Sequence, residues 1–138
     1  MMKINFGIAF GVFGAIAAAG NADTGKQAVS FSRDVQPIFS ARCTMCHHES
    51  DHMGELVLSP SLAYDQLVNV PAVGAPKFSR VTAKKPQTSY LMMKLDGIHA
   101  KVGGKGWLMP PPTNPFIRLG SSDREIIRRW IAQGAQNN

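Results

Sequence analysis

Cys43-Thr44-Met45-Cys46-His47 is the stretch of this 138-residue sequence that constrains the fold most. Two thiols three positions apart cannot link distant parts of a chain, and there is no other cysteine, so a disulfide framework is excluded. A structural zinc site would need four ligands, and a thioredoxin-like redox pair would need a βαβ context that the sequence lacks. The pattern C-x-x-C-H instead predicts the attachment site of a c-type haem.

The spacing of this motif has a chemical reason. The thiols of Cys43 and Cys46 can each form a thioether with one haem vinyl group. The next side chain then lies beneath the iron, where an imidazole is a good axial ligand. We therefore expect one haem c, attached covalently through Cys43 and Cys46, with His47 as an iron ligand.

Met109 is the main candidate for the sixth iron ligand. It lies in a loop, residues 103–115, whose glycines and prolines exclude both a helix and a central strand. Pro110 confines the backbone of Met109 to extended conformations, and a rigid loop favours binding by a weak thioether ligand. His99 is the alternative, in a bis-imidazole site, and a sixth position without a protein ligand is a second alternative. Trp107 is expected either to contact the haem edge or a propionate, or to pack in the core.

The other methionines and histidines are expected to have structural or surface roles. Met45 lies within the cysteine loop, and Met53 follows His47 too closely to reach around a haem ring. The core candidates are Met92 and Met93, and the surface candidates are His48 and His52.

The N-terminal sequence predicts export. Lys3 precedes an uncharged apolar run, Phe6–Ala19, and small residues follow up to Ala22. The run is shorter than the roughly 20 residues that span a bilayer, so we predict a signal peptide over residues 1–22 and no membrane span after processing. Residues 23–138 would form a single periplasmic domain, beginning with a poorly ordered arm up to residue 30.

Four short helices are predicted in this domain. The first ends at Cys43 and has Asp34 as its N-cap; the second follows Ser59-Pro60 and the third starts at Pro86. The last has an apparent capping box, Ser122-x-x-Glu125, and a stripe of isoleucines with Trp130, which we expect to pack against the first helix. No strand pattern is visible, so the sequence predicts an all-α fold wrapped around the haem.

The order of these pieces resembles a family, the monohaem class I c-type cytochromes, and in particular the haem domains common in planctomycetes and related bacteria. The resemblance runs nearly from end to end and implies a small cytochrome c fold, with His47 as the proximal and Met109 as the distal ligand. Two departures are His48, where a small residue is usual, and Thr82–Pro86, where a more acidic, glycine-containing turn is usual. The matching stretches are Asp34–Phe39, Cys43–His47, Ala63-Tyr64, Leu67–Pro71, Ser89–Leu91, Lys94-Leu95, Met109–Pro111 and Arg129–Ala135.

These expectations together predict a periplasmic electron carrier rather than an enzyme, since two axial ligands leave no position for a substrate. The full chain has a net charge of +6, which becomes +5 when Lys3 is removed with the signal peptide, and this charge favours acidic redox partner proteins. No basic recognition helix points to nucleic acid. The alternatives are a haem enzyme or gas- or peroxide-responsive protein with a labile sixth site, and the cytochrome subunit of a larger oxidoreductase. The lysines and arginine expected to steer partners are Lys77, Arg80, Lys84, Lys85, Lys101 and Lys105.

Overall fold

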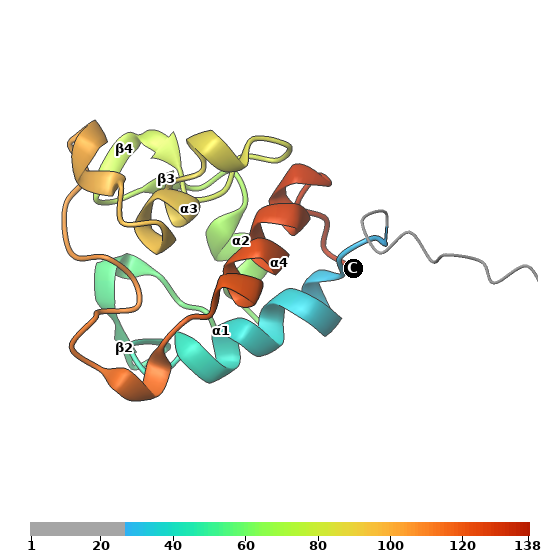
Figure 1. The fold of residues 1–138 in the computed structure, drawn as a ribbon, viewed down its shortest axis with the longest axis horizontal. Helices are drawn as coiled ribbons and strands as arrows, with labels where there is room; N and C mark the ends of the chain where they lie inside the picture. Colours follow the sequence, from blue (N-terminus) through green and yellow to red (C-terminus); the bar gives the residue numbers. More distant parts are fainter. Residues whose placement is uncertain (1–26) are drawn as a thin grey trace, which may run out of the picture.

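The computed structural model describes residues 27–138, so the predicted signal peptide, residues 1–22, lies outside the described residues. The α-helices are α1 (Gln36–Arg42), α2 (Ala63–Leu67), α3 (Tyr90–Leu95) and α4 (Ser121–Ala132). The strands are β1 (His47–His48), β2 (Asp51–His52), β3 (Pro71–Ala72) and β4 (Ala75–Ser79). A π-helical turn spans Phe31–Val35, and 3₁₀ turns span Met53–Glu55, Pro86–Thr88, His99–Val102 and Pro115–Ile117. Helix α4 lies beside α1, and β3, β4 and α3 gather at one end of the molecule (Figure 1).

The strands show that the predicted all-α class is wrong, because the described chain has a mixed α/β fold with two small antiparallel sheets. In the first sheet His47 pairs with His52, and in the second a bulge separates the pairs made by Pro71 and Ala72. Strands β1, β2 and β3 have two residues each, which is too short for an alternation of apolar and polar residues to be recognised. Strand β4 contains Pro76, which lacks an amide donor and argues against a strand in the sequence.

The first helix begins earlier than predicted, with Ser30 rather than Asp34 as its N-cap. The Ser30 hydroxyl accepts a hydrogen bond from the Arg33 amide at 3.2 Å, and the Asp34 carboxylate accepts one from the Ser30 amide at 2.8 Å. This reciprocal capping satisfies two free amides and starts the π-helical turn that continues into α1. Asp34 therefore does contribute to the cap, from inside the first turn.

Helix α4 also starts earlier than predicted, with Gly120 as its N-cap two positions before Ser122. The Gly120 amide donates to the Asp123 carboxylate at 3.3 Å, which makes Asp123 rather than Glu125 the capping acid. The apolar stripe of this helix is buried as predicted, with Trp130 only 1% exposed. Its ring centroid lies 5.1 Å from that of Phe31, and Phe39 of α1 is part of the same core. The expected packing of the first helix against the last is confirmed.

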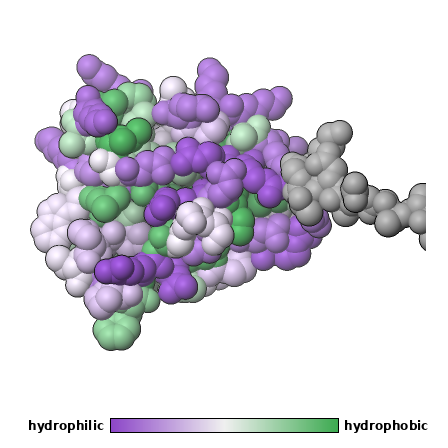
Figure 2. Space-filling view, in the orientation of Figure 1, coloured by the Kyte–Doolittle hydropathy of each residue, from purple (hydrophilic) through white to green (hydrophobic). Residues whose placement is uncertain are grey.

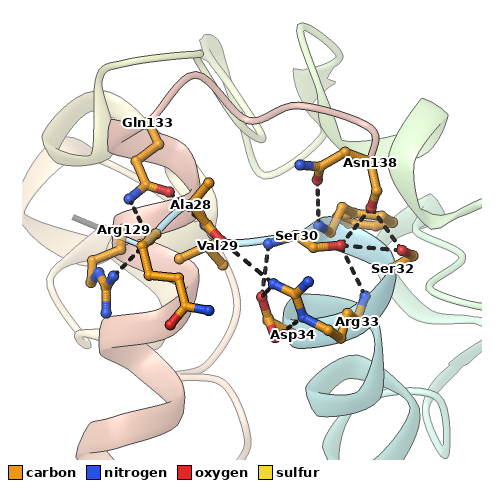
Figure 3. Close-up of polar contacts among 11 residues, drawn as sticks. Ala28, Val29, Ser30, Ser32, Arg33, Asp34, Arg129, Gln133 and Asn138 are labelled. Atoms are coloured by element: carbon orange, nitrogen blue, oxygen red, sulfur yellow. Dashed lines mark hydrogen bonds and ion pairs between the residues drawn. The ribbon is translucent and has the colours of Figure 1, made fainter. Parts of the chain in front are cut away.

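The chain preceding the first helix is held against α4, which corrects the prediction of a poorly ordered arm for its last residues (Figure 3). The Val29 amide donates to the Gln133 side chain at 2.8 Å, and Arg129 donates to the Gln27 carbonyl at 3.0 Å. The Phe31 amide donates to the side chain of Asn138 at 2.8 Å. These hydrogen bonds hold the two ends of the described chain together beside the aromatic core.

Candidate functional site

A cavity of about 630 Å³ lies among α1, α2, α3, α4 and the loop that carries Met109. This volume is in the ordinary range for a bound organic ligand. Its wall is mostly apolar, and it includes Phe39, Leu58, Leu67 and Ile127. Hydrophobic residues reach the surface in the middle of the face seen in Figure 2, with hydrophilic residues around them.

Cys43, Cys46, His47 and Met109 all line this one cavity. Cys43 directly follows α1, and its amide donates to the Phe39 carbonyl at 2.8 Å. The Cys43 carbonyl in turn accepts the amides of Cys46 and His47 at 3.1 and 3.0 Å, which closes a tight turn. The helix end and this turn therefore bring both thiols and the imidazole to the same cavity.

The orientation of the His47 ring is set by the backbone. Its Nδ1 lies 3.2 Å from the Leu56 carbonyl, which can only accept, so Nδ1 carries the proton and Nε2 keeps a free lone pair. Metal-binding histidines commonly have their second nitrogen held in this way. Burial lowers the pKa of His47, and the charges of Arg80 and Lys94 act in the same direction. The lowered pKa favours a neutral ring, and the bond to Leu56 then leaves the lone pair on Nε2.

Cys43 is partly buried at the end of α1. Burial raises its pKa to about 12, and the neighbouring Cys46 contributes in the same direction. In haem-free Cys46→Ala protein the burial of Cys43, the larger cause, remains, so we expect slow alkylation of Cys43 by iodoacetamide at pH 8 and a rate that climbs as the pH is raised, because only the thiolate reacts. The same variant unfolded in urea is the control; equal rates in the folded and unfolded protein would contradict the assignment.

Met109 is held at the cavity by α3. Its amide donates to the Lys94 carbonyl at 3.0 Å, and Pro110 and Pro111 continue along the cavity wall. Trp107, two residues earlier, also lines the cavity but is 66% exposed. The alternative of core packing for Trp107 is therefore wrong, and its ring belongs to the rim of the cavity.

The charged side chains on the cavity wall are all basic. Arg80 is only 7% exposed, which corrects its predicted place in an exposed steering loop. Its Nη1 donates to the backbone and side-chain oxygens of Gln66 at 2.8 and 3.1 Å, and its Nη2 donates to the Glu55 carbonyl at 2.7 Å. No described carboxylate forms a salt bridge with it. The charged residues that line the cavity are Arg42, Arg80, Lys94 and Lys105.

The remaining candidates are placed away from this cluster, with one exception. Met92 and Met93 are buried core residues, as predicted, and Met45 is exposed. Met53 lines the cavity, although its side chain is largely exposed. His99 is buried outside the cavity wall, with its Nε2 2.7 Å from the Gly106 carbonyl.

Sequence reasoning missed Arg80 and Lys94 as residues of the site. In the sequence, Arg80 cannot be distinguished from the exposed basic residues near it. Its burial depends on the tertiary arrangement of β4 and α3. Helical spacing gives a weak indication of Lys94, because Lys94 shares one face of its helix with Tyr90 and Leu91, and both of these residues line the cavity.

Comparison with known proteins gives no match: no protein-family model, no curated protein and no solved structure is similar to this chain. Within residues 27–138, no helix has the length and apolar character needed to cross a membrane. In the same part of the chain, no group of three or more His, Cys, Asp and Glu side chains is arranged to hold a metal ion.

Proposed function

We propose that this chain is a periplasmic electron-transfer protein, a c-type cytochrome, that carries one haem c through thioether bonds to Cys43 and Cys46. His47 and Met109 would be the axial ligands of its iron. The observation that carries the proposal is that one apolar cavity is lined by both thiols of a C-x-x-C-H motif, by its histidine and by a methionine from a distant loop.

The cavity suits a flat, apolar ligand that has acidic groups at one edge. Its walls are mainly hydrocarbon, and its charged side chains are cations, which would balance the two propionates of a haem. Arg80 has donors left for this purpose, because its Nε donates to no described residue. The neutral ring of His47 and the thioether of Met109 are the donor types found on low-spin cytochrome iron.

Electron transfer is favoured over catalysis by the side chains that surround the cavity. The bound haem would supply one iron that gains and loses a single electron. His47 is the single histidine on the described wall, and no carboxylate lines it, so a peroxidase-like acid–base pair has no counterpart there. Burial and ligation by His47 and Met109 would raise the reduction potential.

The rim of the cavity is the proposed contact with redox partners. Trp107, Val73 and Met53 line the cavity and are each at least half exposed, and the exposed Lys105 lines the same cavity. Of the basic residues expected to steer partners, Arg80 is buried and the other five are exposed: Lys77, Lys84, Lys85, Lys101 and Lys105. This charge favours partners with acidic surfaces, through faster association more than through tighter binding.

Replacing Met109 by alanine tests the axial ligand. The wild-type ferric protein is expected to show a weak sulfur-to-iron charge-transfer band at the red end of the optical spectrum, and Met109→Ala is expected to lose it. Met45→Ala is the matched control, because Met45 is an exposed methionine in the cysteine turn, and it should keep the band. A wild-type spectrum of high-spin or bis-imidazole type, unchanged in Met109→Ala, would remove Met109 from the iron.

A further inference from the structure

The segment that brings Trp107 and Met109 to the cavity has no regular secondary structure between the 3₁₀ turns His99–Val102 and Pro115–Ile117. Helices and strands hold their own backbone in place, but this segment must be held by its neighbours. The stretch at issue is residues 104–109, which supplies Lys105, Gly106, Trp107 and Met109 to the cavity wall.

Three side chains bind two consecutive carbonyls of this stretch. The Lys105 carbonyl accepts hydrogen bonds from the Tyr90 hydroxyl at 3.2 Å and from Lys94 Nζ at 3.0 Å. The Gly106 carbonyl accepts one from His99 Nε2 at 2.7 Å. We call Tyr90, Lys94 and His99 the carbonyl clamp; its members come from α3 and from the turn that follows it.

The amides of the same stretch are bound as well. Those of Gly104, Lys105 and Met109 donate to the carbonyls of His99, Gly74 and Lys94 at 2.9, 3.0 and 3.0 Å. The fit is close, since a Cβ atom on Gly104 would lie 2.6 Å from the Tyr90 hydroxyl and 2.8 Å from the His99 carbonyl. The carbonyl clamp and these backbone carbonyls therefore hold both the acceptors and the donors of the stretch.

Among the three residues of the carbonyl clamp, His99 is the one whose residue type is not explained by packing in the core. Its side chain is buried, with the residue 6% exposed, and because a carbonyl can only accept, its Nε2 must carry the proton. Its Nδ1 is then a buried acceptor, and it has no partner among the described residues. A leucine would fill a similar volume without an unpaired polar atom, so packing alone favours an apolar residue here. The bond to Gly106 is the one polar contact that the ring makes in the described structure.

We propose that His99 is a positioning residue: by holding the Gly106 carbonyl, it fixes residues 104–109 so that the Met109 thioether stays at the cavity. The role of Met109 rests on the proposed function, whereas the effect of His99 on the loop does not. The proposal also replaces the earlier alternative of His99 as an iron ligand, because His99 does not line the cavity and its Nε2 is bound to the Gly106 carbonyl.

The test compares His99→Leu with His99→Gln, whose side-chain amide offers an N–H to the same carbonyl. Hydrogen exchange is measured in the reduced holoprotein at the Met109 and Lys105 amides, and at the Ala135 amide, which donates to the Trp130 carbonyl in the core. We expect about tenfold faster exchange at the first two amides in His99→Leu, the effect of losing one buried hydrogen bond, and little change at Ala135. The charge-transfer band should weaken in His99→Leu and recover in His99→Gln. His52→Leu, at an exposed histidine, should alter none of these.

The outcomes of this test distinguish the positioning role of His99 from the proposed function of the chain. Unchanged exchange at Met109, or an equal increase at Ala135, would overturn the positioning role even if the haem spectrum is normal. Faster exchange at Met109 and Lys105 in a His99→Leu protein that carries no haem would support the positioning role of His99 and overturn the proposed function. If His99→Leu does not fold, nitrogen-15 NMR of the wild type reads the tautomer directly; a proton on Nδ1 would contradict the bond to Gly106.

Discussion

Replacing both Cys43 and Cys46 by alanine is expected to abolish covalent haem attachment completely, and each single replacement is expected to leave a haem held by one thioether. The reason is local chemistry, because both thiols lie in one turn at the same cavity wall and the chain has no other cysteine. Intact mass under denaturing conditions measures the attachment, since a covalent haem stays on the unfolded chain.

Met45→Ala is the matched control for this experiment, because Met45 lies between the two cysteines and its side chain is exposed. It should retain the full haem mass. Covalent haem in the Cys43→Ala/Cys46→Ala protein, or a wild type secreted with two free thiols, would contradict the proposed function. All variants carry residues 1–22, so that failure to export affects each of them equally.

The candidate site divides into a local part that the sequence could predict and a tertiary part that it could not. The motif Cys43–His47 is contiguous, and its chemistry follows from spacing alone, so its placement on one wall was foreseeable. Met109 was predicted from Pro110 and its loop, and it does line the same cavity. Arg80 could not be predicted, because its burial depends on the Gln66 and Glu55 oxygens that it meets only in the folded chain.

The fold divides in the same way. Helices α2, α3 and α4 lie within their predicted segments because apolar spacing and a final glycine act within one turn of the chain. Pro60 and Pro86 do not start α2 and α3 as predicted, since these helices begin at Ala63 and Tyr90 and Pro86 starts a separate 3₁₀ turn. Strands β1 and β2 were missed, since His47 and His48 are polar and their pairing with Asp51 and His52 comes from the turn between them. A two-residue strand takes its stability from its neighbours rather than from its own sequence.

The cavity and the aromatic core share α1 and α4, which links stability to function. Phe39 contacts the core on one side and lines the cavity on the other, and Ile127 does the same from α4. A loss of packing between the two helices should therefore loosen the wall next to Cys43, in addition to lowering overall stability.

Trp130→Ala is expected to lower the free energy of unfolding by about 3–5 kcal/mol. The ring is 1% exposed and packs against Phe31 and Tyr64, and its indole nitrogen donates to the Gln136 carbonyl at 2.9 Å, so alanine would leave both a void and an unpaired acceptor. Guanidinium unfolding followed by circular dichroism measures the loss.

Trp107→Ala is the control, because the same side chain at the 66% exposed rim should cost little stability. A domain of this size has about 5–15 kcal/mol in total, so the Trp130 variant should lose a substantial part of its stability while the Trp107 variant should not. Similar losses in the two variants would mean that the packing of α4 on the first helix does not hold the fold together. A large loss for Trp130 alone would show that the packing of its ring on Phe31 and Tyr64 is a main source of the stability of the domain.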